Sequence, residues 1–546
     1  MNAAWVCLAG LAVFAFGYFV YSKHLARRVF ALSDDEEVPS RKYEDGHDYV
    51  PTPRAILFGH HYASIAGAAP IIGPAIAIIW GWVPALLWVV LGTVFMGAVH
   101  DFSTLVLSLR HDGRSVGQVT ARVIGPRTRT LFLLVIFFLI FMVIAVFAKA
   151  IATLFIAKPG TVIPINFEIV VALAIGWYAH RKGAKLLVPS ILALVSLYAM
   201  VWVGVKVPVS LEGLFGSHTR DAWVVFLLAY SFVASILPVW VLLHPRDYIN
   251  SHQLLVGLAA LVLGVLVAQP QITAPAFNAA EDGPFWFPFL FVTIACGAIS
   301  GFHGLVSSGT TSKQIACATD ARAIGYGGML GEGLLALVST LAVSAGLSNW
   351  AGHYESWAVA AGHGVANFVE GAGSFLVGLG LPRGPSEVVV AVLVVSFAAT
   401  SLDTGVRIQR YILEELGSIW QVGLLQNRYV ASAIAVLLPL LLYLSGGEGA
   451  IWPLFGTSNQ LLAGLSLTLV TVWLYRTGRP WIYTGIPMVV VLTISSLAMF
   501  LEVRRYLFEG KYLLLLIGGI ILALQIWVVG EAIAAVRRTR KAAAVA

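Results

Sequence analysis

The chain has few charged residues for its length. Only 11% of its 546 residues are Asp, Glu, Lys or Arg, whereas a soluble globular domain carries about 25%. Together with a mean hydropathy of +0.86, this excludes an ordinary soluble enzyme. The net charge of +7 does not indicate a nucleic-acid surface, because the basic residues stand in short clusters between long apolar runs, as in the loops of membrane proteins.

Cysteine is also scarce. The three cysteines, Cys7, Cys296 and Cys317, lie in or beside apolar segments without paired spacing, which excludes a disulfide framework and a cysteine-rich zinc site. The first apolar run, 3–22, has no basic residues before it and no small-residue cleavage site after it. We therefore interpret it as a retained helix and not as a signal peptide.

Long apolar runs are what the sequence has in abundance. A membrane-spanning helix needs about 20 apolar residues, and this length predicts about 15 spans in an all-α polytopic membrane protein. Lys23, Arg27 and Arg28 follow the first run, which places the N-terminus outside because basic loops stay in the cytoplasm. The alternation then puts the basic C-terminal tail in the cytoplasm. It holds if 356–381, with its polar interruptions, is an external amphipathic or re-entrant piece.

The apolar runs also suggest an internal repeat. We expect an N-terminal helix and cytoplasmic linker, two units of five helices, and accessory helices, with these boundaries: 1–53, 54–206, 222–412 (including 356–381 as an external insertion) and 429–546. Since five is odd, the second unit would enter the membrane from the opposite side. Such inverted repeats are typical of secondary transporters, whose substrate lies at interrupted helices near the bilayer midplane.

Both lead helices of these units are interrupted by glycine and proline, at 59–70 and 235–245. Opened turns expose backbone groups that can bind a ligand in a cavity, although a kink that only serves packing is the alternative. Intramembrane histidines add titratable groups. The candidate substrate-binding residues are His60, His61, Ser64, Gly67, Ser235, Pro238 and His303.

A stretch rich in hydroxyl groups, 297–313, offers the oxygen ligands that an alkali cation requires. The candidate ion-coupling residues are Ala63, Ser307, Ser308, Thr311 and Lys149. If the coupling ion is a proton, His60, His61 or Lys149 would carry it. The alternatives are helix packing by small hydroxyls, core histidines and a paired lysine. Asp403 and Arg407, four residues apart, are expected to form a structural ion pair.

Several long strings are similar to those of the carbon starvation protein A family of bacterial inner-membrane transporters. They are Asp48–Thr52, Gly59–His61, Asp112–Ser115, Leu237–Trp240, Pro245–Tyr248, Ile294–Gly297, Gly301–His303, Ser307–Thr311, Gly325–Met329, Asp403–Arg407 and Trp452–Gly456. The resemblance implies transport of pyruvate, or of peptides, and a fold like the leucine-transporter 5+5 inverted repeat. The chain departs from the family in being shorter near 350–385 and the C-terminus, and in having His100 where some relatives have glutamine.

The sequence thus predicts a secondary active transporter in the bacterial inner membrane, not an enzyme, that imports a small carboxylate or peptide with a proton or sodium ion. No cofactor and no nucleic-acid partner is expected. Two alternatives stay open. One is a membrane metalloprotein or oxidoreductase that uses His60, His61, His100, Asp101 and His303. The other is a nutrient sensor with little flux, for which the chain offers no sizeable soluble domain.

Overall fold

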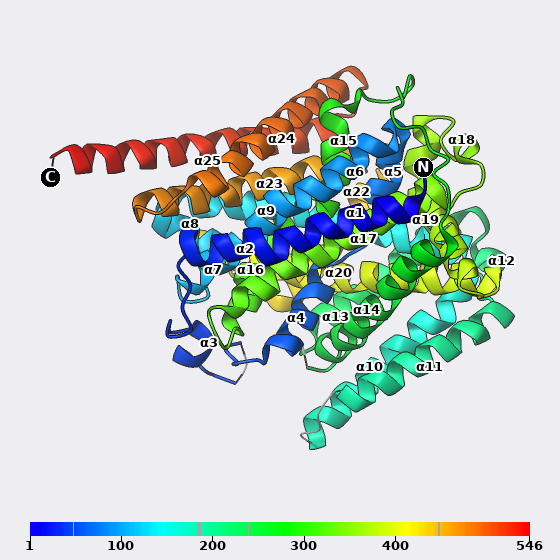
Figure 1. Cartoon of the computed structure of the whole chain (residues 1–546). Coiled ribbons are helices and arrows are strands. Elements are labelled where there is room, and N and C mark those ends of the chain that lie inside the picture. Colours follow the sequence, from blue (N-terminus) through cyan, green and yellow to red (C-terminus); the bar gives the residue numbers. More distant parts are fainter. Residues whose placement is uncertain (47, 183–186, 239, 446–447, 546) are drawn as a thin grey trace.

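The computed structural model describes the chain except residues 47, 183–186, 239, 446–447 and 546. In the described part, twelve helical segments are long and apolar enough to span a bilayer, or thirteen if one bent pair counts as a span. Each matches a run expected from the sequence. The other two expected runs, 429–445 and 451–475, fold as a shorter helix and as a 29-residue helix outside this set. The protein is a multi-pass, all-helical membrane protein (Figure 1).

The N-terminal half begins with a span interrupted by π-helical turns and ends before the loop at 269–285. Its elements are α1 (Ala3–Phe16), η1 (Gly17–Tyr21), α2 (Ser22–His24), η2 (Leu25–Val29), α3 (Pro39–Lys42), α4 (Arg54–Ile65), α5 (Ala69–Ala77), η3 (Ile78–Trp80), α6 (Trp82–Leu87), η4 (Trp88–Gly97), α7 (Ala98–Leu109), α8 (Val116–Val123), α9 (Pro126–Ala157), η5 (Pro159–Thr161), α10 (Val162–Lys182), α11 (Leu187–Lys206), α12 (Glu212–Phe215), η6 (Gly216–His218), α13 (Thr219–Ile236) and α14 (Leu243–Ala268).

The C-terminal half continues with a second series of helices and ends in two long ones. Its elements are α15 (Trp286–Ile294), η7 (Ala295–Gly297), α16 (Gly301–Gly309), η8 (Thr311–Lys313), η9 (Arg322–Tyr326), α17 (Gly327–Ala345), α18 (Trp350–His353), α19 (Trp357–Gly378), α20 (Arg383–Trp420), α21 (Gly423–Gln426), α22 (Arg428–Leu444), α23 (Glu448–Arg476), α24 (Ile482–Phe508) and α25 (Tyr512–Val545).

The first predicted break is present. Helices α4 and α5 are bent by 48° at residues 66–68, and the backbone of Ala66 leaves the helical region at ψ 78°. Pro70 lies in the first turn of α5, where a missing N–H is tolerated and the fixed φ favours a new helix start. The local sequence therefore ends one helix and begins another within three residues.

The second break that meets the first one is at 295–300, and not at 235–245 as the sequence analysis expected. There Ser300 is extended (φ −134°, ψ 125°) between η7 and α16, and α15 and η7 pack against α5. The turn after α13 does leave the helix at Leu237, but Arg407 of α20 donates to the carbonyls of Ala234 and Leu237. That turn is therefore held by α20, away from α5.

Two groups of helices form the core. In the first group, α5 packs against α17 and α15, and α16 packs against α7. In the second group, α9, α13, α20 and α22 pack against one another, with α9 and α20 in the most extensive contact. Helix α14 bridges from α4 to α20, and α23 bridges from α16 to α9. The broken helices thus belong to the first group, which α14 and α23 connect to the second.

The remaining helices surround this core. The hairpin α10–α11 lies at one edge of the molecule, and α24 and α25 lie at the opposite edge (Figure 1). The stretch 356–381 forms the continuous 22-residue helix α19, which packs against α5, α14, α17 and α20. It is therefore a helix with one face inside the bundle and not a re-entrant loop.

The contact between the two breaks generates a stability prediction. A Cβ on Gly73 would lie 2.4 Å from the carbonyl oxygen of Thr293, so Gly73→Ala forces α5 away from α15. We expect a loss of about 1–3 kcal/mol, as for other overpacked cores, measured as a lower midpoint of thermal unfolding in detergent. The matched control is Gly530→Ala on α25, where a Cβ meets nothing within 4 Å. Equal midpoints for the two variants would contradict the close approach.

Candidate functional site

A small cavity lies where the two broken helices meet. Its volume is only ≈ 20 Å³, which is roughly the space of one water molecule. Both helix breaks and four further helices contribute to its wall. The lining residues are Ile65, Gly67, Ala69, Pro70, Val143, Phe147, Cys296, Ser300, Phe302, His303, Glu332, Ser401 and Phe455. The site is therefore closed in this structure.

His303 is the central polar residue of this cavity. It lies in the first turn of α16, and its Nδ1 is 2.8 Å from Oδ2 of Asp101 on α7. Its Nε2 is 2.8 Å from Oε2 of Glu332 on α17. Asp101 is bound on its other oxygen by Nδ1 of His100, at 2.7 Å. One imidazole thus lies between two carboxylates that come from two other helices.

All four of these side chains are buried within the membrane bundle. An isolated buried charge is very costly, so such groups must be neutralised by partners or by protons. Two carboxylates beside one imidazolium leave a net negative charge that one further proton, or one cation, would balance. The geometry therefore provides a site whose protonation and charge are tightly linked.

His61 is buried on α4. Its Nδ1 is 2.8 Å from Oγ1 of Thr311. Ser308 donates to the carbonyl of Gly304 and accepts from the amide of Val116, while the buried hydroxyl of Ser307 has no hydrogen-bond partner in the part of the chain that the structure describes. The expected hydroxyl-lined face thus exists, but Thr311 and Ser308 are engaged with α4 and α8.

His60 faces a second buried network. Its Nδ1 lies 3.5 Å from Oδ2 of Asp247, next to Arg246 in the first turn of α14. Arg246 binds Asp403, and it also donates to Tyr230 at 2.6 Å. Adjacent histidines on α4 therefore reach two different buried clusters.

The second network corrects one sequence expectation. Asp403 is bound by Arg246, Tyr230 and Ser231, and it does not form the ion pair expected with Arg407. The guanidinium of Arg407 instead donates to two carbonyls at the end of α13. In a bilayer, a buried carboxylate takes the partners with which it can be most fully hydrogen-bonded, and these come from other helices.

Other candidate residues are divided between the cavity and the surrounding bundle. Gly67 lines the cavity, and a Cβ there would lie 2.6 Å from Oγ of Ser401. Ala63 and Ser64 are buried on α4, where Ser64 donates to the carbonyl of its own helix residue His60. The residues placed elsewhere are Ser235, bound to Ser432; Pro238, in the turn after α13; and Lys149, half-buried on α9 outside the cavity lining.

The sequence analysis did not select Glu332 or Ser401. Glu332 is a single acidic residue within the apolar run 327–345. Because burying a carboxylate in a membrane is costly, this position alone indicates a functional residue. Ser401 gives no comparable signal, because an isolated serine in a long helix is common. Its hydroxyl is buried without a partner in the described part of the chain, and it faces the break at Gly67.

The adjacent histidines His60 and His61 do not converge on a common point. His60 is directed at Asp247 and His61 at Thr311, so neighbouring imidazoles point to separate partners. In the described ranges, no group of three or more His, Cys, Asp or Glu side chains is arranged to hold a metal ion.

Comparison with solved structures gives transporters of low similarity. MhsT, solved in complex with L-phenylalanine, is 12% identical with a TM-score of 0.47, covering 83% of this chain and 98% of MhsT. A manganese transporter of Eremococcus coleocola is 13% identical with a TM-score of 0.45, covering 91% of this chain and 99% of that one.

Sequence comparison gives much closer relatives. The protein named peptide transporter CstA of Helicobacter pylori J99 is 34% identical, covering 92% of this chain and 82% of the relative. The peptide transporter CstA of Escherichia coli is 33% identical (88% and 78%), and the pyruvate/proton symporter BtsT of the same organism is 32% identical (92% and 82%). These names agree with the expectation that the chain is not an enzyme. The family described as carbon starvation protein CstA matches residues 2–349 and 346–498, and the chain belongs to this family.

Proposed function

We propose that the protein is a secondary active transporter that imports a small carboxylate, pyruvate in the first place, or a peptide, in symport with protons. The observation that carries this proposal is His303, which lies between two buried carboxylates on the wall of a cavity at two helix breaks. An anionic substrate and a proton would both act on this imidazole. The names of the relatives, peptide transporter and pyruvate/proton symporter, support both parts of the proposal.

The helix starts at the cavity favour an anionic substrate. Ala69 and Pro70 begin α5, and Phe302 and His303 begin α16, and all four residues line the cavity. The N-terminal end of a helix carries about half a positive charge and free amide donors. Two such ends beside an imidazole would bind a carboxylate. A cavity of ≈ 20 Å³ must expand to admit either substrate, as alternating access requires.

We infer a 5+5 inverted repeat whose register differs from the expected units 54–206 and 222–412. The first unit would be α4–α5, α6–α7, α9, α13 and α14. The second would be α15–α16, α17, α20, α22 and α23. The hairpin α10–α11 would then be an insertion in the first unit, and α18–α19 an insertion in the second.

Reciprocal packing supports this register. The contact of α5 with α17 is matched by that of α16 with α7, and the contact of α14 with α4 is matched by that of α23 with α15. Likewise, α9 packs against α22 as α20 packs against α13. Exchange of the two units thus maps each contact onto another, as a two-fold relation demands. Alternating access would move the layer with the broken helices against the α9, α13, α20 and α22 layer.

The proposed orientation follows the basic clusters. The N-terminus would face outward and the C-terminal tail the cytoplasm of the bacterial inner membrane, since the basic residues after the first span favour the cytoplasmic side. The coupling proton would be carried by His303 with Asp101 and Glu332. A coupling cation held near Ser307, Ser308, Thr311 and Ala63 becomes the alternative in the experiment below. His60, His61 and Lys149 are the alternative proton carriers.

Transport in proteoliposomes tests the proposal. With the interior more alkaline than the exterior, we expect labelled pyruvate to accumulate, because the proton gradient drives the symport. A sodium gradient alone should have no effect, and unlabelled dipeptide should compete only if peptides share the site. Empty liposomes and collapse of the gradient with a protonophore are the controls. Pyruvate and dipeptide uptake that neither gradient alters would refute coupled transport.

The role of His303 gives a residue-level prediction. In His303→Gln, the ion pair with Glu332 is lost and the hydrogen bond to Asp101 loses its charge. One charged hydrogen bond is worth about 1.5–3 kcal/mol, so loss of this contribution alone should lower proton-driven uptake roughly 10- to 150-fold. Glu332→Gln should also weaken the proton dependence. Exchange of labelled for unlabelled substrate at equal pH should be less affected, if the variant folds. The matched control is His363→Gln on the exposed face of α19, which should transport like the original chain. Full proton-driven uptake by His303→Gln would contradict the assigned role.

A further inference from the structure

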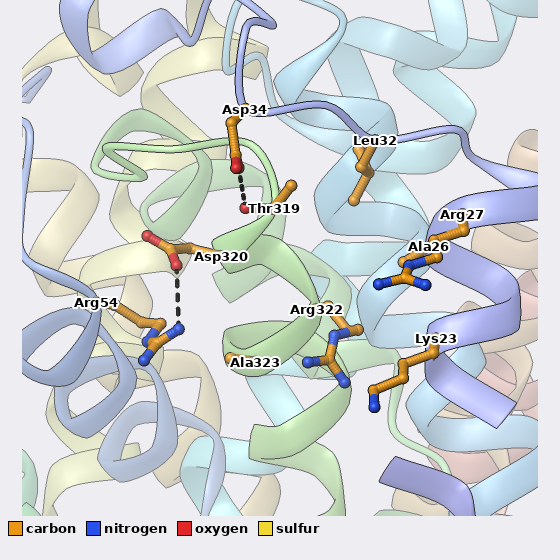
Figure 2. A pocket seen from close by; sticks show the side chains of 10 residues that line it. All are labelled: Lys23, Ala26, Arg27, Leu32, Asp34, Arg54, Thr319, Asp320, Arg322 and Ala323. Atoms are coloured by element: carbon orange, nitrogen blue, oxygen red, sulfur yellow. Dashed lines mark hydrogen bonds and ion pairs between the residues drawn. The ribbon is translucent and has the colours of Figure 1, made fainter. Parts of the chain in front are cut away.

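A second, larger pocket lies far from the closed cavity, at the ends of the spans. Its volume is ≈ 270 Å³, much larger than the ≈ 20 Å³ of the closed cavity. It is lined by Lys23, Ala26, Arg27, Leu32, Asp34, Arg54, Thr319, Asp320, Arg322 and Ala323 (Figure 2). Nothing in the proposed transport cycle uses these residues.

The pocket lies where three chain segments reach the edge of the membrane. The first span ends at Val29, α4 begins at Arg54, and the span that contains α17 begins at Arg322. Its two main walls are the π-helical turns η2 and η9, which carry Arg27 and Arg322. Single π-helical turns inside α-helices are frequent at functional sites. Because three membrane-spanning segments begin or end here, the pocket lies at the level of the lipid headgroups.

Positive charge is in excess in this pocket. Four basic side chains face two acidic ones, and both acidic groups are already engaged. Asp34 accepts hydrogen bonds from Thr319 at 2.5 Å and from Cys317 at 3.0 Å, which lower the pKa of its carboxyl group. Asp320 pairs with Arg54 at 3.7 Å. Figure 2 shows these groups on one side and Lys23, Arg27 and Arg322 on the other.

The three remaining cations have no carboxylate within ion-pair distance among the residues that the structure describes. Arg322 is held in position, because it donates to the carbonyl of Tyr18 and the hydroxyl of Ser22 and stacks over the Tyr18 ring at 4.7 Å. Three like charges around one pocket repel one another unless an anion lies between them. Guanidinium groups match the oxygens of phosphate especially well.

The outer face of the first span, which carries Lys23 and Arg27, is apolar and exposed. Phe16, Phe19 and Val20 are 48%, 61% and 56% exposed, one to two turns before Lys23. In a bilayer this face contacts acyl chains, so a lipid with its chains here would have its headgroup beside the pocket. Basic pockets between spans on the cytoplasmic side are suited to anionic lipid headgroups.

We propose that this pocket binds the phosphate of an anionic phospholipid through Lys23, Arg27 and Arg322. The apolar face of the first span holds the acyl chains, and the fixed guanidinium of Arg322 provides the innermost contact. Arg54 and Asp320 remain paired at the far side. The proposal does not depend on the transport substrate or on the coupling ion.

Native mass spectrometry of the full chain in detergent tests the proposal, with phosphatidylglycerol, phosphatidylcholine or inorganic phosphate added. We expect phosphatidylglycerol to bind and phosphatidylcholine to bind far more weakly. Lys23→Gln with Arg27→Gln should weaken phosphatidylglycerol binding roughly 30-fold, since a basic residue contributes about 1 kcal/mol to such binding. The matched control removes the same charge outside the pocket, by Arg28→Gln with Arg41→Gln, both exposed, and should bind normally.

Three outcomes would overturn the proposal. They are equal binding of the two lipids, equal loss in the two double variants, and inorganic phosphate that displaces the lipid at equal concentration. Arg322→Gln is a further variant, with an expected loss of roughly 5-fold because it removes one charge. If Arg322→Gln does not fold, the double variant of Lys23 and Arg27 still tests the proposal. Both residues are exposed, so their substitution leaves the packing unchanged.

Discussion

The interaction on which the site depends is the contact of the His303 imidazole with two buried carboxylates. Asp101 and Glu332 come from α7 and α17, so the imidazole joins three helices at the closed cavity. Removing one partner from a buried charged pair typically costs 3–5 kcal/mol, because the other charge stays buried. A change of charge at this point therefore affects the packing of all three helices, which links a protonation event to a movement of the layer that contains the breaks.

The second network has a similar character on the other side of α4. Arg246 pairs with Asp403 in a buried cluster that also contains Asp247 and Glu168. Since His60 is near Asp247 and His61 is near Thr311, a rotation of α4 would move both contacts together. The two adjacent histidines thus give α4 a defined rotational position between two polar clusters in an otherwise apolar bundle.

Local features were predictable from the sequence, and the meeting of distant segments was not. The lengths of the apolar runs predicted all thirteen segments that are long enough to span a bilayer in the described part of the chain, counting the bent pair as one. Length and apolar composition are properties of each segment alone, so they can be recognised without knowing its neighbours. The break at 66–68 was predicted from Pro70 and nearby glycines, and it placed Gly67 correctly at the cavity. His303 was selected for a similar reason. An ionisable residue within an apolar run can be recognised from the sequence without knowing which residues it contacts.

The errors have a common cause. The turn at 235–245 has the proline that favours a break, whereas the break at 295–300 has none and depends on close packing, with a Cβ on Gly301 only 2.5 Å from the carbonyl of Asn459. The Asp403–Arg407 pair was expected from a spacing rule for exposed helices. Inside a bilayer, partners on other helices replaced it. Both cases were decided by contacts between residues more than a hundred positions apart.

The peripheral hairpin α10–α11 has an evolutionary consequence. It crosses and returns, so the helices after it keep the same direction that they would have without it. A gene could therefore gain or lose such a pair without turning the later part of the protein upside down. Insertion of a single crossing would invert every downstream loop against its charge bias, so size variation in this architecture should occur in steps of two crossings.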